Sequence, residues 1–205
     1  MEAETANAAE PTGLRQRKKQ ATRERISSIA LERFARDGFA QTTVGSIAAD
    51  AGVATRTFFH YFETKEDVLL GDLMDRLARL LEVVRAQPED MPPLQALWGA
   101  MESLADGFDD SPEAQVRYGM VVGEPSVNGR ALDLQGAWED QIAVLLEPRC
   151  PGPDPLYQAH VVTATGLACL RTAAHASTTG TATLRELLDR SYAALGVATA
   201  GLPPR

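Results

Sequence analysis

The chain has 205 residues and a mass of 22.1 kDa, of which 44% are hydrophobic and 23% charged, so it forms one or two globular domains rather than a disordered chain. The net charge of −8 argues, taken alone, against a nucleic-acid partner. No stretch approaches the roughly 20 apolar residues that span a bilayer, MEAETANAAE does not resemble a signal peptide, and two cysteines exclude a disulfide scaffold, which together predict a cytoplasmic location.

The first helix is predicted after a short tail. Residues 1–13 are rich in Ala, Glu and Thr and lack periodicity, which predicts a disordered tail. A cationic cluster follows, formed by Arg15, Arg17, Lys18, Lys19, Arg23 and Arg25. Ile26, Ile29, Ala30 and Phe34 then repeat with helical spacing, and Gly38 is suited to the position that follows a helix end. We therefore expect a basic segment that continues into a helix.

Two short helices are predicted next. Thr43 is a good N-cap for a helix over 43–51, which Gly52 interrupts after two turns. A second short helix runs over 54–62, and a long amphipathic helix begins at Lys65. Two short helices joined by a glycine-containing turn in a basic segment are typical of a helix-turn-helix unit.

The remainder of the chain is predicted to be helical, without a strand. Apolar periodicity predicts helices over 94–108, from 112 to near Pro125, over 132–146, 156–176 and 183–195. The proline-rich segment 148–155 is expected to be a loop, and the 156–176 helix to be buried on more than one face. The sequence therefore predicts an all-α protein, with a DNA-binding domain over 14–64 and a helical ligand-binding and dimerisation domain over 65–200.

The charges are divided unevenly between these two parts. Residues 14–65 carry ten Lys or Arg and five Asp or Glu, whereas residues 66–205 carry ten Lys or Arg and twenty Asp or Glu. A small basic unit approaches phosphates, while an acidic body remains in solution and avoids DNA elsewhere. This asymmetry favours a nucleic-acid partner that the net charge alone would exclude.

The second short helix has the length that fits a DNA major groove. Its candidate DNA contacts are Thr55, Arg56, Thr57, His60 and Tyr61, flanked by Thr43 and Lys65. Arg56 is suited to a bidentate contact with guanine, whereas Tyr61 and Lys65 are better placed for phosphate. A short polar helix after a glycine turn is also common in helical proteins that do not bind DNA. The basic cluster that precedes it favours DNA binding.

Residues Thr43 to Leu69, TVGSIAADAGVATRTFFHYFETKEDVL, resemble the DNA-binding signature of the TetR (tetracycline repressor) family of bacterial regulators. The resemblance covers about residues 20–70 and includes Ala30, Phe34 and Gly38. It implies an all-helical homodimer whose last two long helices, here about 155–177 and 181–196, pair as a four-helix bundle. It also implies that Phe58 and Phe62 are core anchors, and that Phe59 stands where many relatives carry a DNA-contacting tyrosine.

A ligand cavity is expected in the second domain. The candidate lining residues are aromatic and apolar residues on its central helices: Trp98, Met101, Phe108, Tyr118, Trp138 and Ile142. His160 is a further candidate ligand contact. Ordinary core packing explains most of them, but large apolar cavities are the default form of small-molecule sites. The expected effector is an apolar or aromatic small molecule.

Other chemistry has weaker support in the sequence. His160 and His175 are about 22 Å apart on one helix and cannot share a metal within one subunit. Cys150 follows Arg149, which gives slight support for a redox sensor. No catalytic motif, cofactor motif or metal motif is present. The sequence predicts a repressor that a ligand releases from a near-palindromic operator. A sensor of a protein partner or of thiol oxidation, an activator, and an enzyme on a helical scaffold remain alternatives.

Overall fold

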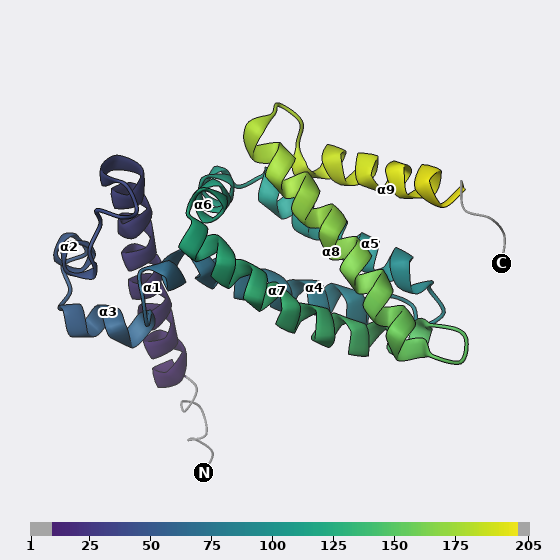
Figure 1. Ribbon diagram of the computed structural model, residues 1–205. Helices are drawn as coiled ribbons and strands as arrows, with labels where there is room; N and C mark the ends of the chain where they lie inside the picture. The colour runs from purple at the N-terminus through teal and green to yellow at the C-terminus, as the bar shows by residue number, and fades with distance from the viewer. Residues whose placement is uncertain (1–9, 201–205) are drawn as a thin grey trace, which may run out of the picture. The chain divides into compact units, whose positions relative to one another are not determined.

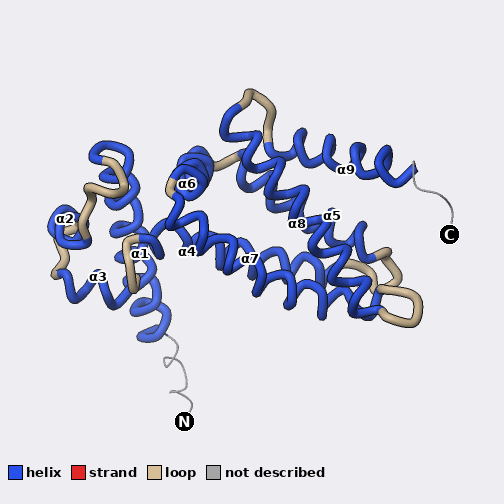
Figure 2. The backbone as a smooth tube through the Cα atoms, viewed as in Figure 1, coloured by secondary structure: helices blue, strands red, loops and turns tan. Residues whose placement is uncertain are grey.

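A computed structural model describes residues 10–200 of the chain, and within that range every regular element is a helix (Figures 1 and 2). The all-α prediction is therefore confirmed. The chain divides into two compact units, Met1–Leu69 and Leu70–Arg205. None of the helices in the described range is both long enough and apolar enough to cross a membrane.

The first unit contains α1 (Glu10–Asp37), α2 (Val44–Asp50), α3 (Thr55–Tyr61) and the first turn of α4 (Glu66–Ala86). Nine residues of the predicted disordered tail lie outside the described residues, but residues 10–13 are already helical, so the helix begins earlier than predicted. Apolar residues of these helices and of the segments between them form the core of this unit, chiefly Ile26, Ala30, Phe34, Phe39, Ile47, Ala48, Phe58, Phe62 and Leu69.

The second unit contains the rest of α4 and five further α-helices. These are α5 (Pro93–Asp109), α6 (Pro112–Gly123), α7 (Pro125–Leu146), α8 (Pro155–Thr179) and α9 (Leu184–Ala200), with a short 3-10 helix, η1 (Glu147–Arg149), after α7. Helix α8 contacts α5, α6, α7 and α9 and is the central helix of this unit. Residues of α4, including Leu77, Leu80 and Val84, complete its apolar core.

Proline begins four helices of the second unit, because the first turn of a helix does not use the N–H that proline lacks. The predicted start at Ser111 and Pro112 is confirmed, since the Ser111 side chain accepts from the Ala114 N–H. Pro125, however, also begins α7, seven residues before the predicted start at Leu132. The predicted 148–155 loop is likewise shorter, because Pro148 and Arg149 belong to η1.

Helix α8 approaches α5 closely at Gly166. A Cβ added at Gly166 would lie 2.6 Å from Leu97 Cδ2 and 3.4 Å from Met101 Cε, both on α5. The buried side of α8 faces this contact, whereas Tyr157 and Val161 on the other side are 67% and 48% exposed. Within residues 10–200 α8 is therefore buried on one side, against its neighbouring helices, whereas the sequence predicts burial on more than one face.

Asp109, the last residue of α5, caps the start of α9. Its two carboxylate oxygens accept the N–H groups of Leu184 and Arg185 at 2.8 and 2.9 Å. The Arg185 side chain in turn pairs with Asp106 at 3.1 Å and Glu102 at 3.2 Å. Because a carboxylate satisfies helix N-terminal donors and favours the positive end of the helix dipole, this contact fixes the start of α9 against α5.

Candidate nucleic-acid interface and ligand cavity

The turn between α2 and α3 is held by backbone bonds. Gly52 has a φ of +63°, the left-handed conformation that glycine adopts without steric cost. The Val53 N–H donates to the Ala48 carbonyl at 2.9 Å, and the Gly52 N–H donates to the Ala49 carbonyl at 3.1 Å. These two bonds define a Schellman motif, which ends α2 and sets the direction in which α3 begins.

Thr43 caps α2 from the other end. The Ser46 N–H donates to Thr43 Oγ1 at 3.1 Å, and the Thr43 N–H donates to Ser46 Oγ at 3.3 Å. This reciprocal capping box gives the Thr43 side chain a role in the fold of the unit. Thr43 is exposed at the start of α2.

Helix α3 separates its side chains into two faces. Phe58 is fully buried and Phe62, which follows the helix, is 5% exposed, as the family resemblance implies. On the other face Thr55, Arg56 and His60 are exposed, and Phe59 is 52% exposed. Thr57 and Tyr61 are partly buried. The buried phenylalanines thus anchor the helix, and its opposite face offers hydrogen-bonding groups of several lengths together with one aromatic ring.

Lys65 makes contacts within the first unit rather than pointing into solvent. Its Nζ donates to the carbonyls of Phe39 at 2.7 Å and Thr42 at 3.0 Å, and it lies 4.4 Å from the centre of the Phe39 ring. These groups belong to the segment between α1 and α2. Lys65 therefore ties that segment to the start of α4, which differs from the phosphate contact expected from the sequence.

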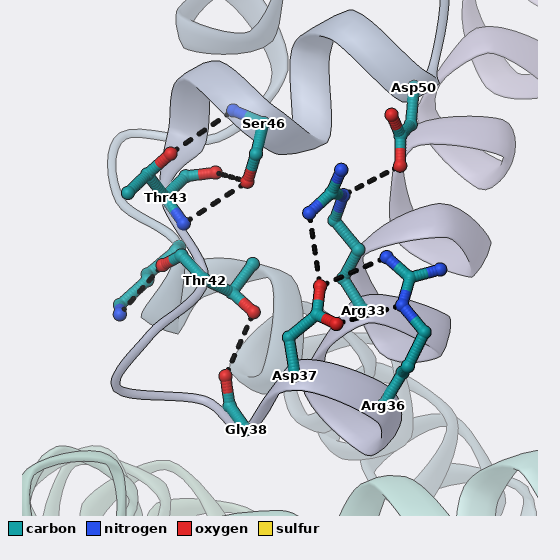
Figure 3. Close-up of polar contacts among 9 residues, drawn as sticks. Arg33, Arg36, Asp37, Gly38, Thr42, Thr43, Ser46 and Asp50 are labelled. Atoms are coloured by element: carbon teal, nitrogen blue, oxygen red, sulfur yellow. Dashed lines mark hydrogen bonds and ion pairs between the residues drawn. The ribbon is translucent and has the colours of Figure 1, made fainter.

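Arginine–carboxylate pairs join the ends of α1 and α2 (Figure 3). Arg33 Nε donates to Asp50 at 2.7 Å, and Arg33 Nη1 donates to Asp37 at 3.0 Å. Arg36 donates to both oxygens of Asp37, at 2.8 and 2.9 Å. The hydrogen bond from Arg33 lowers the pKa of Asp50, and that from Arg36 lowers the pKa of Asp37. These four residues, here termed the arginine brace, connect the two helices.

The arginine brace predicts a pH-dependent effect of Asp50→Asn. A carboxylate whose pKa is lowered by folding stabilises the fold above its unfolded pKa of about 3.9 and loses that effect as the pH falls through its folded value. We therefore expect Asp50→Asn to lower the midpoint of thermal unfolding at pH 7 and to lower it less at pH 3, measured by circular dichroism. The exposed-carboxylate control Glu32→Gln should change the midpoint less at pH 7. An equal loss at both pH values would contradict the brace.

The basic cluster predicted from the sequence lies on α1. The Arg23 guanidinium lies 5.2 Å from the centre of the Phe62 ring, directly after α3. Lys19 and Arg15 precede Arg23 by four and eight residues, so the three cations share one side of α1. This side continues the core-facing stripe of Ala30 and is exposed at Arg15 and Lys19. Positive charge therefore extends along α1 away from the end of α3.

A cavity of about 150 Å³ lies in the second unit. It is lined by residues of α4 to α9: Leu73, Arg76, Leu104, Phe108, Ala114, Arg117, Tyr118, Val121, Val122, Asn128, Ala131, Leu132, Gln135, Trp138, Leu167, Leu170, Arg171, Ala174 and Leu184. Phe108 and Tyr118 meet edge to face with ring centres 6.0 Å apart. Burial raises the pKa of Tyr118, partly opposed by the positive charge of Arg171, so its hydroxyl remains protonated at neutral pH.

Three of the predicted ligand contacts, Phe108, Tyr118 and Trp138, line this cavity, and four do not. Met101 and Ile142 are fully buried in the core, and Trp98 packs against Tyr192 with ring centres 4.8 Å apart. His160 is part-exposed, with Nδ1 4.0 Å from Asp140. The lining arginines were missed, although Arg171 follows Leu167 by four residues and therefore shares its side of α8.

The cysteines and histidines do not form a reactive centre. Burial raises the pKa of Cys150 and of Cys169, which disfavours the thiolate that a redox sensor requires. Arg149, the cation next to Cys150, donates hydrogen bonds to the carbonyls of Val84, Gln87 and Pro88 at the end of α4. In the part of the chain that the structure describes, no three His, Cys, Asp or Glu side chains converge on a possible metal position.

Known proteins resemble this chain in sequence and fold. The family model for bacterial regulatory proteins of the tetR family matches residues 26–71. The HTH-type regulator TcmR of Streptomyces glaucescens is 39% identical over 92 residues, 45% of this chain and 41% of TcmR. MftR of Mycobacterium tuberculosis, a putative mycofactocin biosynthesis regulator, is 29% identical over 138 residues, 66% of this chain and 69% of MftR. The match to TcmR thus spans less than half of that protein.

A solved structure extends the likeness over most of the chain. FadR of Thermus thermophilus, a TetR-family transcriptional repressor crystallised with lauroyl-CoA, is 28% identical with a TM-score of 0.58, covering 89% of this chain and 96% of FadR. The α2–α3 pair, joined by the Gly52 turn, and the exposed face of α3 define a helix-turn-helix protein. With the family model and these relatives, the chain belongs to the TetR family of bacterial regulators.

Proposed function

We propose that this protein is a homodimeric transcriptional repressor that binds a near-palindromic DNA operator and is released from it by a small molecule. The observation that carries this proposal is the division of α3 between buried Phe58 and the exposed groups of Thr55, Arg56 and His60. A helix with one anchored side and one polar side fits the major groove of B-DNA, which is about 12 Å wide. The names of TcmR, MftR and FadR support a regulator in the cytoplasm rather than an enzyme.

The basic side of α1 supports the same proposal. Arg15 and Lys19 are exposed and lie on the side of α1 where Arg23 contacts Phe62. Cations next to a recognition helix neutralise phosphates beside the bases that the helix reads, which adds affinity without sequence preference. Base preference would then come from α3, and much of the salt-dependent affinity from α1.

Exposed apolar residues of the last two helices support a homodimer. Tyr157 and Val161 on α8 and Tyr192 on α9 are 67%, 48% and 51% exposed. Helices that show an apolar side to solvent bury it by packing against further helices, and four-helix bundles are a common solution. Two copies pairing through α8 and α9 would present two recognition helices to half-sites roughly 34–36 Å apart.

Release by a ligand requires a path from the cavity to α3. Leu73 and Arg76 of α4 line the cavity, and α4 is one helix from Glu66 to Ala86. Lys65, immediately before it, bonds the segment between α1 and α2. A ligand that favours one position of α4 therefore shifts the population of DNA-binding conformers, and DNA must weaken ligand binding by the same factor.

Fluorescence anisotropy with labelled DNA tests this function. The duplexes are the region upstream of the protein's own gene and a scrambled version, each titrated with the full chain at two salt concentrations. A regulator should bind the correct duplex about 10³-fold more tightly than the scramble. If the two duplexes bind equally, selection from random DNA supplies further sequences, and failure to enrich any sequence would contradict specific recognition.

Arg56→Ala tests which side chain of α3 reads the bases. We expect the variant to lose about 1–3 kcal/mol of discrimination at one base-pair position, because a bidentate contact between arginine and guanine would be removed. Operator variants with single base-pair changes, measured by anisotropy, identify that position. Arg79→Ala on α4, an exposed arginine of the second unit, is the matched control. Unchanged affinity and unchanged base preference in Arg56→Ala would remove Arg56 from the interface.

A further inference from the structure

The side chains that line the cavity carry positive but no negative charge. Arg76, Arg117 and Arg171 are among the lining residues, and none of the described lining residues is Asp or Glu. The remaining surface is largely aliphatic and aromatic. Because a buried cation without a carboxylate partner is strongly unfavourable, this lining disfavours an amine ligand and favours a neutral or anionic one.

Hydrogen-bond donors lie together on adjoining sides of α7 and α8. The Trp138 Nε1–H is buried without a hydrogen-bond partner, and an indole nitrogen can only donate. Gln135 lies three residues before Trp138, on the same side of α7, and its Oε1 accepts from Arg171 Nη1 at 3.4 Å. Arg171 is exposed at this edge of the cavity, and Gln135 links it to the side of α7 that carries the unsatisfied indole donor, so we expect an acceptor bound here to lie near both donors.

The other two arginines are already engaged. Arg117 pairs with Glu113 at 2.7 Å, and the Arg76 guanidinium lies 5.4 Å from the centre of the Phe108 ring. Arg171 is therefore the cation best placed to receive a charged ligand group, and its bond to Gln135 is long. A carboxylate matches this arrangement because its oxygens accept from planar guanidinium donors in a forked geometry.

The size of the cavity limits the rest of the ligand. A dry cavity of about 150 Å³ accommodates a ligand of the size of benzene, and the cavity here has about that volume. The Phe108–Tyr118 pair and aliphatic residues such as Leu104 and Leu167 form its walls. The volume thus suits a non-polar part of one ring or a short branched chain.

We propose that the effector is a compact apolar carboxylate, an aromatic or branched-chain acid whose carboxylate accepts hydrogen bonds from Trp138 Nε1 and Arg171. The apolar part of the acid lies against Phe108, Tyr118 and the aliphatic wall. This inference rests on the proposed function, since the term effector requires a ligand-responsive regulator. It adds an anionic group to the apolar or aromatic small molecule expected from the sequence.

Isothermal titration calorimetry of the full-length protein with three molecules of matched shape tests the charge preference. Phenylacetate should bind at least ~10-fold more tightly than phenylacetamide, because hydrogen bonds to a charged group are stronger than those to a neutral one. Phenethylamine should show no measurable binding. The branched acid 4-methylpentanoate should bind like phenylacetate. Equal binding of the acid and the amide, or binding of neither acid, would overturn the proposal.

Two variants locate the carboxylate. Arg171→Met keeps an unbranched apolar stem and removes the guanidinium, so phenylacetate should bind ~10-fold more weakly while phenylacetamide changes less than twofold. Trp138→Phe keeps a ring and removes the N–H, and it should also weaken phenylacetate selectively. Arg190→Met on α9, an exposed arginine outside the cavity lining, is the control. Circular dichroism of each variant shows whether it folds. If both folded variants bind phenylacetate as the native protein does, the assignment is wrong.

Operator release is measured separately by anisotropy. Acid binding that leaves the operator complex intact would support the carboxylate site and contradict ligand-induced release. Specific operator binding together with no preference for acids would support the regulator and contradict the carboxylate site. The two proposals therefore fail in distinguishable ways.

Discussion

Replacing Phe58 with alanine is expected to lower the free energy of unfolding of the first unit by about 3–5 kcal/mol, the usual cost of removing a buried aromatic ring. Phe58 is fully buried, and its ring centre lies 5.6 Å from that of Phe62. The cavity left by the ring would detach α3 from the core that orients it. Chemical denaturation followed by circular dichroism measures the loss, and operator binding should disappear at denaturant concentrations that the native protein tolerates.

Phe59→Ala is the matched control, because it removes the same side chain from the next position. Phe59 is 52% exposed, so its replacement should change the free energy of unfolding by less than about 0.5 kcal/mol while still altering operator affinity. The two neighbours thus separate the anchoring face of α3 from its DNA-facing side. Equal destabilisation by both variants would show that α3 is rotated relative to the orientation described above.

Lys65→Met is expected to lower the free energy of unfolding by roughly 2–4 kcal/mol, because two carbonyls lose a charged donor. Hydrogen bonds to charged groups are each worth about 1.5–3 kcal/mol, and the total is reduced here because the bonds are only partly buried. The two hydrogen bonds are those that Lys65 Nζ donates to the carbonyls of Phe39 and Thr42. Methionine preserves most of the aliphatic stem, so the variant isolates the ammonium group. Thermal unfolding at neutral pH measures the effect.

The salt dependence of operator binding separates this role from the one expected from the sequence. A lysine that contacts phosphate lowers the slope of log affinity against log salt by about one when it is removed. Lys65→Met should instead leave the slope unchanged and reduce stability. Lys18→Met, which removes an exposed cation of α1, serves as the comparison and should leave stability unchanged. If Lys65→Met lowers the slope without destabilising the protein, the phosphate contact expected from the sequence is correct and the structural role is wrong.

Local signals in the sequence predicted most of the first unit. Thr43 and Gly52 mark the two ends of α2 because capping and left-handed turns depend on single residues. The spacing of Phe34 from Ala30 likewise placed α1 against the core. At Pro125 the same reasoning failed, since proline ends a helix and begins the next one with equal ease, and only the structure distinguishes the two roles.

Long-range contacts could not be predicted in this way. Lys65 bonds to backbone carbonyls 23 and 26 residues away, and Asp109 caps a helix that begins 75 residues later. The partners are backbone carbonyls in the first contact and backbone N–H groups in the second, and neither kind of group depends on residue identity, so neither contact has a sequence pattern. The cavity is similar: aromatic residues suggested it, but only the packing of α4 to α9 decided that Tyr118 lines it and Met101 does not.

The close approach of α8 to α5 at Gly166 restricts how this protein can diverge in sequence. An alanine there would have to displace a methyl group of fully buried Leu97, and overpacking of a tight core typically costs about 1–3 kcal/mol. Gly136 on α7, where an added Cβ would meet nothing within 4 Å, carries no such restriction and gains helix propensity from alanine. The spacing of the two helices therefore depends on the absence of a side chain at Gly166. We expect this position to remain glycine while other positions of α8 change.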